Sequence, residues 1–169
     1  MKKIHILSYL SLGCCVLLSG CAFWQLSDPP MTQLQIREVQ TRELDTTDTK
    51  LVMKSMMNVL QDEGFIIKNA VMDIGLLSAE KHVDIEDKFV SAFSLYSNPH
   101  ASWKKQKILE ASANLSEFGE KTRVRINFQV KILDNFGRLC SVWSIQDSEY
   151  YRDFFNKVRA GVFIQEQDI

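Results

Sequence analysis

Cysteine is scarce in this chain, and its few copies are unevenly placed. Three of the four cysteines lie within the first 21 residues, and Cys140 is the only one in the rest of the chain. One thiol cannot form an internal disulfide, so a domain built from the chain after residue 21 depends on its apolar core. Cys140 lies in an apolar segment with no histidine motif nearby, and we expect a buried, unreactive thiol on a strand.

The chain also has no large excess of positive or negative charge. The chain has 20 lysines and arginines against 21 aspartates and glutamates. A nucleic-acid-binding domain would need a basic surface or stripe, so we predict no nucleic-acid partner. The sequence also lacks internal repeats and low-complexity tracts, which is typical of an ordinary globular domain.

Familiar catalytic and cofactor motifs are absent from the sequence. It contains no HExxH, paired CxxC, P-loop, GxSxG or glycine-rich dinucleotide signature. His82 and His100 lie far apart in the sequence without the spacing of a metal pair, and the acidic stretch 80–87 lacks the ligand spacing of a calcium loop. We therefore predict no catalytic residues, no metal and no cofactor, and we expect a protein that is not an enzyme.

Three methionines stand close together in the sequence. Thioethers could bind Cu(I) or form a pliant groove for a partner, but ordinary core packing is the better interpretation. These residues are Met53, Met56 and Met57.

The N-terminus, "MKKIHILSYLSLGCCVLLSGCAFW", carries the clearest signal. Two lysines precede the apolar stretch Ile4–Leu18, which is the layout of an export signal. The stretch is shorter than the roughly 20 apolar residues of a comfortable membrane span. We therefore predict a signal peptide over residues 1–20.

Leu18-Ser19-Gly20-Cys21 resembles the lipobox of bacterial lipoproteins. The resemblance implies cleavage before Cys21, a diacylglycerol on its thiol and a fatty acyl chain such as palmitate on its amino group. Several acyl chains anchor a protein durably where one holds it only marginally. Ala22, in place of the aspartate that retains such proteins in the inner membrane, implies the outer membrane, most simply facing the periplasm. The alternative is an ordinary signal peptide with Cys21 unmodified.

A tether is expected over residues 21–32, ahead of one domain over residues 33–169. Pro29-Pro30 stiffens this tether, and Phe23 and Trp24 suit a position beside the lipid interface unless they pack on the domain. The length after residue 32 is sufficient for a single domain with its own core.

The predicted elements alternate between helices and antiparallel strands. A strand is expected over 33–44, followed by a helix that begins near Asp45 or Thr46 and ends at Gly64. A hairpin over 65–83 turns at Gly75. A second helix is expected over Ile85–Tyr96, where apolar residues recur at helical spacing.

The C-terminal half contains the clearest strand pattern. In "TRVRINFQVKI", five apolar residues from Val124 to Ile132 alternate with polar ones, which predicts a strand with one buried face. Strands over Lys107–Leu115 and Leu139–Ile145 flank it. A last helix over Ser148–Gln165, capped near Asp147, has an apolar stripe formed by Tyr151, Phe154, Phe155, Val158 and Val162. Together these elements predict an α+β fold: one antiparallel sheet of about five to six strands, with two or three helices on one face.

Two further resemblances concern the domain after the signal. Its topology is similar to that of BamC-like accessory domains of envelope assembly machines. The stretch "NVLQDEGFIIKNAVMDIGLLSAEK" resembles a segment of periplasmic lipoproteins without an assigned activity. Both resemblances imply an accessory role and indicate no activity.

One segment is a candidate for a partner or membrane surface. In "SNPHASWKKQK", an amphipathic ring stands beside three cations, an arrangement that suits anionic headgroups or an acidic partner. These residues are Trp103, Lys104, Lys105 and Lys107. A solvated loop with Trp103 folded into the core is the equal alternative. The outer face of the Arg123–Lys131 strand is a second candidate.

The sequence thus predicts a non-enzymatic, lipid-anchored accessory or scaffold protein of an envelope assembly, secretion or efflux machine. It would contact the membrane through its N-terminal lipid and bind an envelope protein, in an oligomeric state that the sequence does not specify. The alternative is a periplasmic binding module for a small or lipid-like ligand held between sheet and helices. An envelope hydrolase comes last, because no triad or metal set supports it.

Overall fold

The computed structural model describes residues 31–98 and 100–167. The predicted signal peptide, Cys21 and nearly all of the tether lie outside these described residues. From Met31 onward the chain forms one compact unit. The predictions that concern residues 1–30 remain predictions.

Six strands form one antiparallel sheet, in the order β1-β5-β4-β3-β2, and β6 pairs with the same edge of β5 as β1. The two long central strands, β4 and β5, pair along almost their whole length. The strands are β1 Thr41–Leu44, β2 Ile66–Val71, β3 Leu76–Asp84, β4 Lys104–Phe118, β5 Lys121–Asp134 and β6 Leu139–Ser144.

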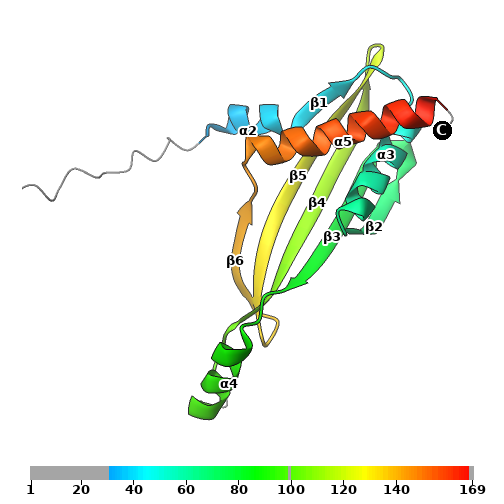
Figure 1. Cartoon of the computed structure of the whole chain (residues 1–169). Coiled ribbons are helices and arrows are strands. Elements are labelled where there is room, and N and C mark those ends of the chain that lie inside the picture. Colours follow the sequence, from blue (N-terminus) through cyan, green and yellow to red (C-terminus); the bar gives the residue numbers. More distant parts are fainter. Residues whose placement is uncertain (1–30, 99, 168–169) are drawn as a thin grey trace, which may run out of the picture. The chain divides into compact units, whose positions relative to one another are not determined.

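Two helices, α3 and α5, lie side by side over one face of this sheet (Figure 1). Two more stand elsewhere: α2 precedes β1, and α4 lies beyond one end of the sheet. The helices are α2 Gln33–Val39, α3 Thr49–Asp62, α4 Lys88–Ser97 and α5 Ser148–Glu166, with a short 3-10 helix, η1, over Met72–Ile74. This arrangement confirms the predicted fold class.

The core forms where alternating residues of β5 meet the apolar stripe of α5. The six alternate β5 residues from Thr122 to Ile132 are buried, as the sequence pattern predicts. Phe128 lies at the centre, with its ring centroid 5.3 Å from that of Phe154 and 5.6 Å from that of Tyr151. All five residues of the predicted α5 stripe are buried. Helix and strand periodicity therefore converge on one core.

A buried tyrosine completes the split edge of β5. β1 pairs with β5 over residues 122–125 and β6 pairs with it over 129–133, which leaves a gap at Phe128. The Phe128 N–H donates to the Tyr151 hydroxyl at 3.2 Å, and this hydroxyl donates to the Ile145 carbonyl at 3.1 Å. Burial raises the pKa of the Tyr151 phenol, so the group stays protonated and can donate. One side chain thereby satisfies backbone groups where the strands part.

The capping predictions for α3 and α5 hold with small shifts of position. The Asp48 carboxylate accepts from the Leu51 N–H at 2.9 Å and the Asp147 carboxylate accepts from the Glu149 N–H at 2.8 Å, so each caps its helix. Gly64, at φ 85°, follows the end of α3. Gly75, at φ 64°, turns the hairpin, and a Cβ there would lie 2.1 Å from the Leu115 carbonyl oxygen. The predicted second helix begins at Lys88 rather than at Ile85.

The strand predicted over 33–44 is wrong in its first half. Residues 33–39 form α2, and only Thr41–Leu44 form a strand. The reason is a capping box: the Thr32 N–H donates to Gln35 Oε1 at 2.8 Å, and the Gln35 N–H donates to Thr32 Oγ1 at 3.4 Å. These reciprocal bonds start a helix where the imperfect alternation suggests a strand.

The prediction of a buried Cys140 is wrong as well, although its strand is present. Cys140 lies on β6 and is exposed. β6 is an edge strand, and its register with β5 shifts next to Cys140, between Ile132 and Leu133. An apolar run indicates a strand but does not indicate that something covers it.

No helix in the described parts of the chain is long and apolar enough to cross a membrane.

Candidate functional site

The segment that the sequence analysis selected as a candidate surface, around Trp103, lies at one end of the sheet. Asp84 at the end of β3 pairs with Gln106 near the start of β4, and α4 lies in the connection between these two strands. The β5–β6 turn reaches the same end, because Asp134 pairs with Lys104. We call the residues 85–98, 100–105 and 134–139 the α4 end.

The predicted surface residues are divided between two environments at this end. Trp103 is half-buried, and its Nε1–H donates to Glu86 Oε1 at 3.2 Å. Lys105 lies 3.9 Å from the same carboxylate, and Lys104 is exposed. Lys107 is partly buried and pairs with Ile132, on the sheet face that the helices cover. The tryptophan and the first two lysines therefore share the α4 end, and Lys107 lies on β4 beyond it.

Hydrogen bonds fix the β5–β6 turn to the segment that follows α4. The Trp103 N–H donates to Asn135 Oδ1 at 3.2 Å, and the Asn135 side chain donates to the Ala101 carbonyl at 3.3 Å. Ser102 Oγ donates to the Asp134 carboxylate at 2.9 Å. Two segments more than thirty residues apart in the sequence thus form one unit.

Asp134 is the electrostatic centre of that unit. Burial alone would raise its pKa, but donors from the Arg138 backbone and guanidinium, from Ser102 and from the Phe136 backbone lower it to about 2. The Arg138 Nε–H donates at 2.7 Å and the Arg138 N–H at 2.8 Å. This buried carboxylate is therefore ionised at neutral pH and holds the turn in place.

Several apolar side chains in the described part of α4 are exposed. Ser91 is only 7% exposed, whereas Val90 is 47%, Leu95 49% and Tyr96 92% exposed. The Ser91 hydroxyl donates to the Lys88 carbonyl within the helix, at 3.1 Å. Among the described residues, α4 makes no extensive contact with another helix or strand. Among the α4 side chains that the structure describes, Ser91 is therefore the buried one, and three apolar side chains, Val90, Leu95 and Tyr96, are exposed to water.

The second candidate surface is the sheet face that α3 and α5 leave uncovered. Its central side chains carry amides and hydroxyls and lie opposite one another across the strands: Ser78, Ser112 and Asn127 form one row, and Asn114 and Arg125 are paired in the next. Ion pairs border it: Arg123 with Glu43 at 2.9 Å and Lys131 with Glu110 at 2.6 Å. We call this surface the polar face.

Carboxylates with lowered pKa values are spread over the molecule. Hydrogen bonds from Lys68 and then His82 lower the pKa of Glu80, and a hydrogen bond from Lys121 lowers that of Asp45. Neither lies in the Asp134 turn, and each has its own cationic partner. Such shifts are typical of structural ion pairs and do not gather in one cleft.

Aromatic side chains line a small hollow at the junction of α3, α5 and β5. Its volume is about 200 Å³, and its apolar walls are Phe65, Phe128, Tyr150 and Phe154. Glu63 and Lys157, which form an ion pair, and Asp153 also line it. Burial and then the Glu63 carboxylate raise the pKa of Tyr150 to about 12. The hollow suits one small apolar group.

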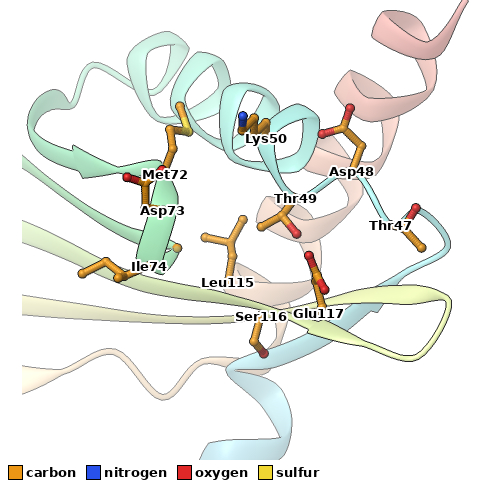
Figure 2. A pocket seen from close by; sticks show the side chains of 11 residues that line it. Thr47, Asp48, Thr49, Lys50, Met72, Asp73, Ile74, Leu115, Ser116 and Glu117 are labelled. Carbon is orange, nitrogen blue, oxygen red and sulfur yellow. The ribbon is translucent and has the colours of Figure 1, made fainter.

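A larger and more polar hollow lies beside the start of α3. It measures about 570 Å³ and is lined by the first turn of α3, by η1 and by the end of β4. Figure 2 shows Thr49, Leu115 and Glu117 gathered between α3 and β4. The Asp48 carboxylate is engaged in capping α3, and Asp73 and Glu117 add acidity against Lys50. Carboxylates at a helix N-terminus disfavour a bound anion there.

The remaining sequence candidates have structural surroundings. Met53 and Met56 are fully buried in the core, as predicted, and Met57 packs against it. His82 lies within hydrogen-bond distance of Glu80 and Gln106, whereas His100 follows α4. In the described residues no three His, Cys, Asp or Glu side chains gather in a way that could hold a metal ion.

Sequence reasoning did not find that Val90, Leu95 and Tyr96 of α4 are exposed. Its apolar spacing was recognised, but spacing indicates only that a stripe exists. The three serines interleaved with apolar residues in "FVSAFSLYS" are the signal that could have raised the question.

The chain matches no model of a known protein family, and a search of curated proteins finds no significant match.

Proposed function

We propose that this protein is a non-enzymatic accessory protein of the bacterial envelope. In this proposal Cys21 carries the lipid that anchors it to the outer membrane, facing the periplasm, and the folded domain binds a protein of an assembly, secretion or efflux machine. The anchor keeps the domain at a high local concentration near such a machine, so weak contacts are sufficient.

The observation that carries the proposal is the polar face. Ser112, Asn114 and Arg125 are exposed there, and the amides and hydroxyls are held in register by β3, β4 and β5. A rigid array of donors and acceptors suits a complementary polar protein surface, in which hydrogen bonds and bridging waters are frequent.

Two other observations favour binding over catalysis. The shifted carboxylates Glu80, Asp45 and Asp134 lie apart, and each is explained by its own donors. The large hollow near α3 is lined by polar residues around a helix cap, whose carboxylate Asp48 is already engaged, and by the apolar side chains of Met72, Ile74 and Leu115. An active site would bring groups with shifted pKa values into one cleft.

Site-specific photo-crosslinking in cells tests the proposed face. A photoreactive residue at Asn114, on the polar face, should capture a defined envelope protein. The same residue at Asn156, an exposed amide on α5, is the matched control and should capture much less. Equal capture at both positions would remove the polar face as the docking surface.

Cell fractionation tests the anchor separately. Cys21→Ser should release a folded domain from the membrane fraction, because Cys21 is the proposed site of acylation. Membrane retention of this variant at the level of the parent would contradict the lipid anchor.

A ligand-binding module is the second candidate, and the aromatic hollow favours it. Phe65, Phe128 and Tyr150 would enclose a small apolar group between sheet and helices. Its volume of about 200 Å³ is below the roughly 300–1,000 Å³ of typical ligand pockets. Recovery of a small lipid from the purified protein, with no crosslinked partner, would favour this function over the first.

A further inference from the structure

We infer that the α4 end is a membrane-binding surface, in which α4 lies in the interfacial layer of a bilayer. The occupant is a lipid surface containing anionic headgroups. This inference rests on the lipid anchor of the proposed function and adds a second, independent contact with the membrane.

The described part of α4 exposes apolar surface to water. Val90, Leu95 and Tyr96 are all exposed, so their apolar surface gains nothing from burial in the domain. An isolated helix of ten residues is also only marginally stable in water. An apolar layer that covers the outward side chains removes both costs.

The β5–β6 turn adds further apolar surface beside α4. Hydrogen bonds between Asn135 and the segment at Ala101–Trp103 place the β5–β6 turn beside the base of α4. In this turn Phe136 is exposed, and so is Leu139 at the start of β6. Exposed apolar side chains on neighbouring segments, rather than scattered singly, mark a contact surface.

Amphipathic rings and exposed lysines at the α4 end favour a lipid surface over a purely apolar partner. Trp103 and Tyr96 are the amphipathic rings that favour a membrane interface. Lys88 and Lys104 are exposed, and within the described residues neither forms an ion pair. Free cations beside apolar side chains match anionic headgroups above acyl chains.

The length of the chain between Cys21 and the domain bears on whether the anchor and the α4 end can contact one bilayer. β1, which follows α2, pairs with β5 at Arg125, and from there to Asp134 β5 spans about 30 Å at roughly 3.3 Å per residue. The chain from Cys21 to Thr32 can extend to about 36 Å at its limit. The limiting length of this chain is comparable with the length of that part of β5, so a lipid anchor at Cys21 is compatible with contact between the α4 end and the same bilayer.

The test is sedimentation of the unacylated chain with vesicles. The chain over residues 21–169 with Cys21→Ser, which lacks the apolar stretch Ile4–Leu18, is mixed with vesicles of phosphatidylethanolamine containing a minority of phosphatidylglycerol. We expect binding, and we expect Leu95→Asp combined with Tyr96→Ser to weaken it about tenfold or more, the effect of withdrawing a leucine-sized side chain from an apolar layer. Leu34→Asp, at an exposed leucine of α2, is the matched control and should bind like the parent.

Further variants separate the contributions. Lys104→Glu should weaken binding to anionic vesicles and leave binding to phosphatidylcholine vesicles unchanged. Trp24→Ser tests whether the tether alone binds; loss of binding with this variant but not with the α4 variant would overturn the inference. Failure of the parent to bind vesicles would overturn it too.

Self-association is the remaining competing occupant. If sedimentation velocity shows dimers that Leu95→Asp dissociates while vesicle binding is absent, α4 is covered by a second copy and the inference is wrong. Because the vesicle experiment uses unacylated protein, it can fail while fractionation and crosslinking still support the anchored accessory function. It can also succeed if no partner is recovered.

Discussion

Helices α5 and α4 contrast in how the same kind of pattern is used. Both have apolar residues at helical spacing, and both connect to strands of one sheet. In α5 the stripe from Tyr151 to Val162 is buried against β5. In the described part of α4, Ser91 is buried, whereas Leu95 and Tyr96 are exposed. The difference teaches that apolar residues at helical spacing need a surface that buries them, and that this surface need not belong to the same chain.

The largest effect is expected at the centre of the α5 contact. Phe128→Ala should lower the free energy of unfolding by about 3–5 kcal/mol, because it removes a ring that packs among four aromatic neighbours and leaves a cavity. Urea unfolding followed by circular dichroism measures this change. Phe163→Ala, at an exposed phenylalanine of α5, should change stability by no more than about 0.5 kcal/mol. Similar losses for the two variants would contradict the assigned core.

A smaller loss is expected at the split edge of β5. Tyr151→Phe should cost about 1–3 kcal/mol, because the Phe128 N–H and the Ile145 carbonyl lose their shared partner in a buried site. Hydrogen exchange should show faster exchange at the Phe128 amide. Tyr150→Phe is the control, since no hydrogen bond of the Tyr150 hydroxyl is present among the described residues. An unchanged Tyr151→Phe variant would mean that water replaces the hydroxyl.

At the α4 end the expected effect depends on pH. The folded pKa of Asp134 is about 2, below the ordinary value of 3.8, so its contribution is fully present above about pH 4 and is lost as pH falls toward 2. Asp134→Asn should therefore reduce stability at neutral pH and lose its effect near pH 2. Thermal unfolding of both proteins across this range measures the difference. A gap between them that persists at pH 2 would assign the effect to packing instead of charge.

The smallest change in stability is expected for an exposed residue of α4, and it tests the contrast between α4 and α5 directly. Leu95→Ser should change the free energy of unfolding by no more than about 0.5 kcal/mol, because Leu95 is half exposed and α4 has no extensive contacts among the described elements. Val158→Ser at a buried position of α5 should cost several times more. Chemical denaturation of the pair gives the ratio. A large loss for Leu95→Ser would show that α4 packs on the domain in solution.

Much of the fold follows from local sequence signals. The alternation from Val124 to Ile132 predicted β5 and its buried face, and the periodicity from Tyr151 to Val162 predicted α5. Gly75 marked the hairpin turn because its backbone adopts a positive φ. The strand predicted over 33–44 was wrong, because the Thr32–Gln35 capping box outweighed a weak alternation.

The candidate surfaces were predictable only in part. The sequence singled out Trp103 and its neighbouring lysines, and the structure brings Trp103, Lys104 and Lys105 to the α4 end but places Lys107 on the helix-covered face of β4. The partnership with the β5–β6 turn depends on Asn135 and Asp134, more than thirty residues away. Hydrogen bonds across that separation exist only once β4 and β5 have paired.

The sequence by itself determined the periodic elements: the helix over 49–62, the long alternating strand and the final helix with its apolar stripe. It also supplied the basis for the predicted signal and lipid site at Cys21, which lie outside the described structure. Only the tertiary structure decided that Cys140 is exposed, that α3 and α5 cover one face of the sheet and leave the polar face open, and that Val90, Leu95 and Tyr96 of α4 are exposed. Periodicity is a local property of the backbone, whereas burial depends on which distant segments arrive to cover a surface.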